Sequence, residues 1–179
     1  MAKILLGVTG SIAAYKAAEL VRLMVKNGHE VKVVMTEAAT KFVTPLTFRT
    51  LSKNPVGVEE FAEPEEWKPE HIALSDWAEL AVIAPASANT IAKMRFGLAD
   101  NLLTSVLLAT RAKILIAPTM NTGMWENPAV QENLAALKAR GAVVAEPGDG
   151  ELACGTSGKG RMMEPAQIMA AIEKELGAK

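Results

Sequence analysis

Two segments of the chain are almost uninterrupted runs of apolar residues, and both are too short to cross a membrane. They are ELAVIAPA at Glu79–Ala86 and AKILIAPT at Ala112–Thr119. A strand with one face in water alternates apolar and polar residues, whereas a strand covered on both faces does not. Both runs therefore predict strands buried within a parallel sheet that has helices on each side.

The rest of the chain repeats this strand–helix alternation. Further strands are predicted at Lys3–Val8, Glu30–Thr36 and Ala142–Pro147, and helices at 11–28, 126–141 and Pro165–Leu176. Repeated strand–helix units build a doubly wound sheet. We therefore predict a single α/β domain over residues 1–179, with three layers and a mostly parallel, Rossmann- or flavodoxin-like sheet.

The first helix has clear end signals and an apolar face. Ile12, Leu20 and Met24 fall on one side of it, Ser11 is placed to cap its start, and Gly28 is placed to end it. We expect this face to pack against the sheet.

Two segments interrupt the alternation. Pro64–Trp77 is polar, is broken by prolines and contains His71. Glu146–Met162 holds five glycines and Cys154. Long segments without regular structure are often functional, so we expect a long flexible loop at Glu146–Met162.

Composition excludes several classes of protein. Of 179 residues, 50% are hydrophobic and 22% are charged, and the formal net charge is −1 without a block of basic residues. Nothing in this pattern favours a nucleic-acid partner. With one cysteine, the chain forms no internal disulfide, which fits a reducing compartment. No signal peptide or membrane-spanning run is present, so we expect a cytoplasmic protein.

In an open α/β sheet, ligands bind at the carboxyl ends of the strands. After the first strand, Gly7 and Gly10 allow a tight turn, and the amides of Ser11 and Ile12 open the helix, where a phosphate can bind. The third glycine of the dinucleotide motif is missing. A tight turn without a ligand is the alternative.

The second strand ends at Thr36, where a dinucleotide site would have an acidic residue for the ribose. A hydroxyl suits a terminal phosphate better, and this favours a mononucleotide. Glu37 follows directly and leaves the point open, and Thr36 can equally serve as a helix cap.

After Glu79–Ala86 comes PASANTIAK, where Ser87, Asn89 and Thr90 offer hydroxyl and amide groups at the start of a helix. Each of them can also be explained by helix capping. Three such groups together are more than a cap requires, so we take them as candidate ligand contacts.

The loop after Ala112–Thr119 contains Met120, Asn121, Met124 and Trp125. These residues can form a local hydrophobic cluster that holds the loop down. They can also pack against a flat aromatic cofactor or against a partner subunit.

The remaining reactive residues are isolated. A lone histidine such as His71 is more often structural than catalytic. Cys154 lies in a polar, glycine-rich segment, where an exposed thiol can donate a proton or act as a nucleophile. One cysteine and two widely spaced histidines form no metal site.

Together these motifs resemble the flavin-containing cysteine decarboxylases, and within them the phosphopantothenoylcysteine decarboxylases of bacterial coenzyme A synthesis. The resemblance covers essentially the whole chain. Its motifs are GVTGSIAAYK, His71 in EHIALSDWA, PASANT at Pro85–Thr90, PTMNTGMW at Pro118–Trp125, and ACGTSGKGRM at Ala153–Met162.

This resemblance implies FMN as the cofactor and 4′-phospho-N-pantothenoylcysteine as the substrate, which is decarboxylated to 4′-phosphopantetheine. It implies a thioaldehyde intermediate, loss of carbon dioxide to an enethiolate, and final reduction and protonation. An ordinary α-amido carboxylate cannot accept the electrons of decarboxylation, which explains the need for a flavin.

The resemblance also assigns roles to residues. His71 would assist proton removal, Asn121 would bind the substrate carboxylate and amide, and Cys154 would protonate the reduced intermediate. Substrate contacts are implied at Asn121, Met124, Ala153 and Lys159. The glycine-rich segment is implied to be a flap over the substrate near residues 147–162. Cofactor contacts are implied at Gly10, Ser11, Ile12, Thr36, Ser87, Asn89 and Thr90.

Members of the family form homotrimers that often assemble into homododecamers, so the resemblance implies a site shared between subunits, with His71 and Asn121 from different chains. In many bacteria the domain is fused to a phosphopantothenate–cysteine ligase, which leaves a fused or separate ligase partner open. The rivals are an oxidative peptidyl-cysteine decarboxylase of lantibiotic type, a non-catalytic flavin-binding regulator, and an unrelated dinucleotide-dependent oxidoreductase. Cys154 speaks against the first, because only the reductive half needs a proton donor.

Overall fold

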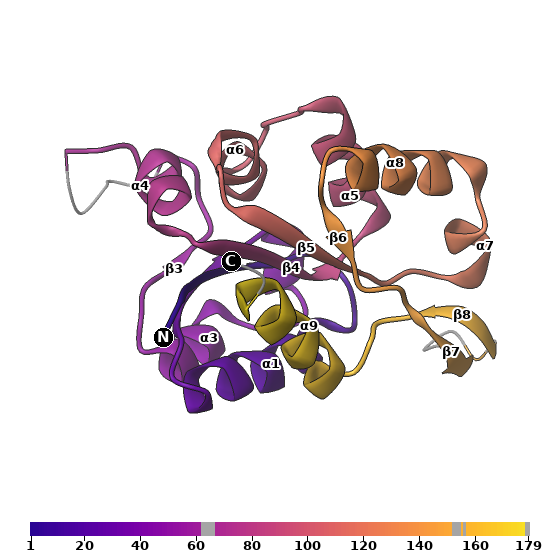
Figure 1. Cartoon of the computed structure of the whole chain (residues 1–179), viewed down its shortest axis with the longest axis horizontal. Helices are drawn as coiled ribbons and strands as arrows, with labels where there is room; N and C mark the ends of the chain where they lie inside the picture. The colour runs from indigo at the N-terminus through magenta and orange to yellow at the C-terminus, as the bar shows by residue number, and fades with distance from the viewer. Residues whose placement is uncertain (62–66, 152–154, 156, 178–179) are drawn as a thin grey trace.

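A six-stranded parallel sheet forms the centre of the protein (Figure 1). The computed structural model describes residues 1–61, 67–151, 155 and 157–177. The strand order is β3-β2-β1-β4-β5-β6, that of the doubly wound dinucleotide-binding fold. The strands are β1 Lys3–Val8, β2 Glu30–Met35, β3 Val56–Gly57, β4 Leu80–Ala86, β5 Lys113–Pro118 and β6 Val143–Val144. The predicted fold class is confirmed.

Helices cover both faces of the sheet (Figure 1). One face carries α1 Ala14–Lys26, α3 Pro45–Ser52 and α9 Pro165–Gly177. The other carries α4 Glu70–Trp77, α5 Ala88–Phe96, α6 Leu102–Ala109 and α8 Pro128–Ala139. Two short helices, α2 Glu37–Thr40 and α7 Thr122–Trp125, directly follow β2 and β5.

Successive residues of a strand point into opposite cores, as the two-residue period of a strand requires. Ile4 and Leu6 of β1 belong to the core beside α1 and α9, whereas Leu5 belongs to the core beside α5 and α6. In β4, Val82 faces the first core and Ile83 the second. This burial on both sides explains why the strand segments read as continuous apolar runs.

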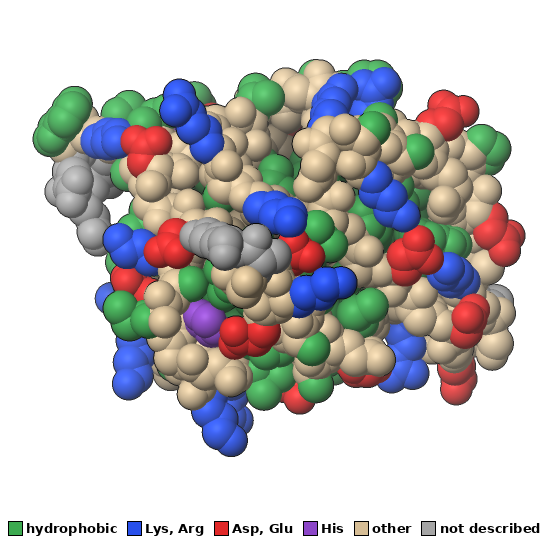
Figure 2. All heavy atoms as spheres, viewed as in Figure 1, with side chains coloured by type: hydrophobic (Ala, Val, Ile, Leu, Met, Phe, Trp, Pro, Cys, Tyr) green, Lys and Arg blue, Asp and Glu red, His purple; other side chains and the backbone are tan. Residues whose placement is uncertain are grey.

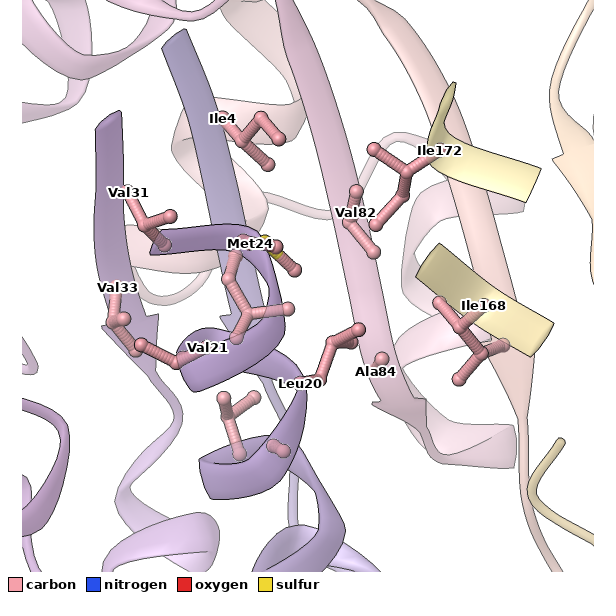
Figure 3. Packing of buried hydrophobic residues seen from close by; sticks show 14 of the residues in the cluster. Ile4, Leu20, Val21, Met24, Val31, Val33, Val82, Ala84, Ile168 and Ile172 are labelled. Carbon is pink, nitrogen blue, oxygen red and sulfur yellow. The ribbon is translucent and has the colours of Figure 1, made fainter. Parts of the chain in front are cut away.

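The packing of α1 and α9 against the sheet is shown in Figure 3. Leu20 and Met24 of α1, and Ile168 and Ile172 of α9, are fully buried against the strands. Burying a side chain of this size stabilises the fold by about 1.5–3 kcal/mol. These contacts hold α1 firmly, and its amino end faces the carboxyl edge of the sheet.

The start of α1 differs from the prediction. The helix begins at Ala14, and Ser11 is not its cap. Instead Ser11 begins a tight turn, in which its Oγ accepts a hydrogen bond from the Ala13 amide and its carbonyl accepts one from Ala14. Ile12, expected on the buried face, is 54% exposed because it precedes the helix. The expected end near Gly28 is confirmed, with φ of 82° at that glycine.

His71 lies on a helix, α4, rather than in an irregular segment as expected. The Pro69 carbonyl accepts hydrogen bonds from the Ile72 and Ala73 amides and starts the helix. In this helix Leu74 and Ser75 are the buried residues. Such a short apolar stripe gives almost no periodic signal in the sequence.

The glycine-rich segment also contains regular structure that we did not expect. Strands β7 Gly148–Glu151 and β8 Ser157–Arg161 form an antiparallel pair. Glycine has a low strand propensity, so this strand pair could not be predicted from the sequence. The predicted strand at Ala142–Pro147 is shorter, since β6 spans Val143–Val144.

Charged residues of both signs are interspersed over the visible surface (Figure 2), as the net charge of −1 suggests. No helix in the described ranges is long and apolar enough to cross a membrane. The last turns of α9 are fixed at the amino edge of the sheet, where Glu173 pairs with His29 at 2.9 Å and Glu175 pairs with Lys113.

A further ion pair ties α1 to the segment after β8. The buried Lys16 ammonium lies 2.8 Å from Oε1 of Glu164, which also pairs with Arg161 at 3.0 Å. The hydrogen bond from Lys16 holds the pKa of Glu164 below its ordinary value of 4.5, and Arg161 adds a smaller effect.

We expect Glu164→Gln to lower the free energy of unfolding at pH 7 by about 1 kcal/mol, because the carboxylate is half exposed and screened. A lowered folded-state pKa stabilises the fold above pH 4.5, and this stabilisation is lost as the pH falls through the folded value. Denaturant unfolding over a pH series should therefore show the two proteins converging in acid. Glu19→Gln, an exposed change on α1, is the control, and a difference independent of pH would contradict the assignment.

Candidate functional site

The sheet has its topological switch point between β1 and β4. These strands are neighbours, but the chain continues from β1 to β2 on one side and from β4 to β5 on the other. In this fold, ligands bind at the carboxyl edge of the sheet beside such a point. The predicted cofactor-contacting residues all follow the three adjacent strands β2, β1 and β4: Gly10, Ser11, Ile12, Thr36, Ser87, Asn89 and Thr90.

Thr9, which the sequence analysis did not single out, joins the two turns. It is fully buried at the end of β1. Its hydroxyl donates to the Pro85 carbonyl at 2.7 Å and accepts from the Ser87 amide at 2.9 Å. A polar residue at the end of an apolar strand, between Gly7 and Gly10, was the available signal. Thr9 fixes the β4–α5 turn relative to the β1–α1 turn.

The turn after β1 contains backbone amides without a hydrogen-bond acceptor among the described residues. Within the described part of the chain, the backbone amides of Gly10, Ser11 and Ile12 donate to no protein acceptor. A Cβ on Gly10 would lie 2.6 Å from the Cβ of Ala38 in α2, so the turn needs glycine there. Three successive unpaired amides before a helix of 13 residues suit a phosphate.

The hydroxyls around this turn also cap helices. Thr36 accepts from the Ala39 amide at 3.3 Å, and Ser87 accepts from the Thr90 amide at 3.3 Å. Thr90 is buried, and its Oγ1 lies 3.2 Å from the Ser87 hydroxyl. Capping therefore accounts for these local contacts. Asn89 is exposed at the start of α5. Ligand contacts at these four residues stay predictions.

Asn121 follows β5 at the same edge of the sheet. It caps α7, and its Oδ1 accepts from the Gly123 amide at 2.8 Å. Trp125 is buried against the core, Met120 packs on the same core, and Met124 is 48% exposed. Trp125 and Met120 thus fix the loop, while Asn121 and Met124 face solvent.

Strand β8 packs closely against this loop. The Met120 amide donates to the Gly160 carbonyl at 3.0 Å. A Cβ on Gly160 would lie 2.2 Å from the Met120 carbonyl oxygen, and one on Gly158 would lie 2.6 Å from Oγ1 of Thr122. Among the described residues, this buried Thr122 hydroxyl has no hydrogen-bond partner. Both glycines are therefore required for β8 to reach the loop.

Lys159, a predicted substrate contact, lies on β8 beside the same loop. Its ammonium is 5.5 Å from the centre of the Trp125 ring and 3.0 Å from Glu146, which also pairs with Lys138 of α8 at 3.1 Å. Hydrogen bonds from Lys159 and Lys138 hold the pKa of Glu146 below its ordinary value. This network fixes the base of the β7–β8 hairpin to α8.

One chain does not bring all the predicted catalytic residues together. His71 is half-buried in the first turn of α4. The preceding residue, Glu70, lies against β3: a Cβ added to Gly57 would be 3.1 Å from Oε1 of Glu70. Asn121 follows β5, and β5 is the fourth strand along from β3 in the sheet. Figure 1 shows α4 and α7 on opposite sides of the molecule.

The other predicted residues of the flap, Ala153 and Cys154, lie outside the described residues. The described residues also contain no group of three or more potential metal ligands.

Comparisons with known proteins bear on the family and the fold of this chain. A family model described as Flavoprotein matches residues 1–177. The chain is 47% identical over 172 residues to the coenzyme A biosynthesis bifunctional protein CoaBC of Vibrio vulnificus strain YJ016, covering 96% of this chain and 43% of that protein. It thus spans less than half the length of this bifunctional relative.

A second relative is matched over nearly its whole length. It is a probable phosphopantothenoylcysteine decarboxylase of Streptococcus mutans, 47% identical over 176 residues, which cover 97% of this chain and 98% of the relative. Among solved structures, a PPC decarboxylase variant complexed with pantothenoylaminoethenethiol superposes with a TM-score of 0.87, 33% identity and 96% coverage of each chain. The FMN binding protein AtHal3 superposes with a TM-score of 0.85 and 33% identity, covering 99% of this chain and 98% of that one.

We expect Gly160→Ala to destabilise the protein by about 1–3 kcal/mol, because a backbone clash with Met120 cannot be relieved by a side-chain rotation. Gly148→Ala, in the paired strand β7, meets nothing within 4 Å and is the control. Denaturant unfolding measures both. Equal stabilities for the two variants would show that β8 does not need to contact the loop.

Proposed function

The chain belongs to the Flavoprotein family, and we propose that it is a phosphopantothenoylcysteine decarboxylase, which converts 4′-phospho-N-pantothenoylcysteine and releases carbon dioxide to give 4′-phosphopantetheine. The end-to-end similarity to the Streptococcus mutans decarboxylase carries this proposal. The similarity to the bifunctional coenzyme A proteins supports the same reaction. A cytoplasmic location remains a prediction.

The residues present fit FMN as the cofactor. The three unpaired amides of Gly10, Ser11 and Ile12 can hold a phosphate at the start of α1. Thr36 and Ser87 add hydroxyls, and Asn89 an exposed amide, at the ends of β2 and β4. When bound, the flavin would supply reversible hydride transfer, so that the electrons released by decarboxylation can be accepted.

The chain's own groups would bind the substrate and move protons. Asn121 is exposed on a loop that Trp125 fixes, so its amide can hold the substrate carboxylate and amide. We assign His71 to the removal of the thiol proton that accompanies thioaldehyde formation. We assign Cys154 to protonation at the enethiolate stage. Lys159, Met124 and Ala153 would contact the substrate as the hairpin covers it and excludes water.

We propose that the complete site forms between copies of the chain, as a homotrimer or a homododecamer. Glu70, the neighbour of His71, lies against β3, whereas Asn121 follows β5, four strands along the sheet. This arrangement supports a site in which the two residues come from different copies of the chain. A neighbouring copy can bring the His71 of one chain to the Asn121 of another. Similar proteins occur both fused in CoaBC and as free-standing chains, so a ligase is a further partner we propose, either fused or separate.

Thr9→Val should weaken FMN binding about tenfold, because it removes the two side-chain hydrogen bonds between the β1–α1 and β4–α5 turns, which we call the cofactor turns. The backbone hydrogen bond from the Thr9 amide to the Pro85 carbonyl remains in this variant. Flavin fluorescence titration of the apoprotein measures the dissociation constant. Thr9→Ser keeps the hydroxyl and should bind FMN nearly normally. Equal affinities for the two variants would show that the side-chain hydrogen bonds of Thr9 do not position the cofactor turns.

The reaction itself is tested by the mass of the product formed from 4′-phospho-N-pantothenoylcysteine. Loss of carbon dioxide alone is expected, and loss of carbon dioxide with two hydrogens would mean that only the oxidative half runs, as in the peptidyl-cysteine decarboxylases. Asn121→Asp should abolish turnover by placing a negative charge against the substrate carboxylate, while bound flavin is retained. Normal turnover in that variant would remove Asn121 from the site.

A further inference from the structure

A cavity lies at the opposite edge of the sheet from the cofactor turns. Its volume is about 420 Å³, and it is bounded by α5, α6, α8 and the start of β5. Lys113 and Ile114, which begin β5, line it, whereas Asn121 follows the end of that strand. Six residues of strand separate the two places by roughly 17 Å. The cavity is therefore separate from the proposed active site.

The inner wall of this cavity is apolar. Leu107 and Leu137 are buried members of the core, and Ile114 packs against them. At the rim, Leu98 and Leu108 are 54% and 62% exposed. An apolar ligand would cover both rim leucines. The volume lies within the range of roughly 300–1,000 Å³ typical of small-molecule sites.

The charged residues that line the cavity are all cations: Lys93, Arg111, Lys113 and Arg140. Two of them are neutralised, since Lys93 pairs with Asp100 at 2.6 Å and Lys113 pairs with Glu175.

The two arginines are not neutralised. Nη1 of Arg140 donates to the Arg95 carbonyl at 2.8 Å, and Arg140 has no carboxylate partner among the residues that the structure describes. Arg111 forms no ion pair within the described ranges of the chain. A guanidinium can bind a carboxylate or a phosphate with two parallel hydrogen bonds. Arg111 is thus the cation best placed to receive an anionic group.

The neighbouring cavity gives a contrast that favours this choice. It has a volume of about 480 Å³ and shares Arg111 and Lys113, but Asp76, Glu79 and Glu175 also line it. Glu175 pairs with Lys113, and Asp76 pairs with Lys68, so carboxylates balance cations on that side of Arg111. The cavity with the apolar wall, by contrast, has no carboxylate among the described residues that line it, which favours an anion on that side of Arg111.

We propose that the 420 Å³ cavity binds a small amphipathic anion, that is, a carboxylate or phosphate group on a short alkyl body. Arg111 holds the anionic group, and Leu98, Leu107 and Leu108 cover the alkyl body. Because the cavity is remote from the cofactor turns, this site is independent of the decarboxylase activity proposed above.

The test uses the flavin-loaded protein and four probes: octanoate, octyl phosphate, octan-1-ol and acetate. Isothermal titration calorimetry is expected to show saturable binding of octanoate, octyl phosphate or both, and much weaker binding of octan-1-ol and acetate. The ratio of the octanoate and octyl phosphate affinities identifies the preferred anionic group. No saturable binding of either anion would overturn the proposal.

Variants locate the binding. Arg111→Gln should lower the affinity for the anion at least tenfold, and Leu108→Asp should abolish its binding. Arg49→Gln, on α3 at the opposite face of the sheet, is the control and should leave binding unchanged. Binding that resists Arg111→Gln would overturn the assignment. A change of oligomeric mass in Leu108→Asp would also overturn it, since the rim would then be a contact between copies of the chain.

Discussion

Burial of the parallel strands on both faces is the constraint on which the rest of the structure depends. Ile4 and Leu6 of β1 face one core, and Leu5 faces the other, so the strand cannot shift by one residue without exchanging the two cores. This fixed register places the ends of β1, β2 and β4 at one edge. The positions of the cofactor turns are therefore set by core packing that lies well away from them.

The strands could be predicted from the sequence because their signal is local. Lys3–Val8 was predicted with its correct bounds, and the runs that became β4 and β5 were predicted to within one residue at each end. Elements with few buried side chains could not be predicted in this way. Helix α4 buries little, and β7 and β8 consist largely of glycine and charged residues, so neither the helical nor the strand period was visible.

The candidate site was predictable as a set of residues but not as an arrangement. Gly10, Ser11, Thr36 and Ser87 were predicted from their places after strands, and they do lie at one edge. The side-chain hydrogen bonds of Thr9, by contrast, connect it to residues that are 76 and 78 positions further along the chain. The contact of Gly160 with Met120 likewise depends on tertiary structure. Such pairs carry no local pattern, because each partner is ordinary in its own segment.

The position of α9 has a consequence for the modular evolution of this family. The helix starts beside the hairpin, but its last turns are fixed at the amino edge of the sheet through Glu173 and Glu175. A domain joined after α9 would emerge there, on the side away from the cofactor turns. An attachment there would lie away from the cofactor turns, which fits the occurrence of similar sequences both within a bifunctional protein and in a relative matched over nearly its whole length.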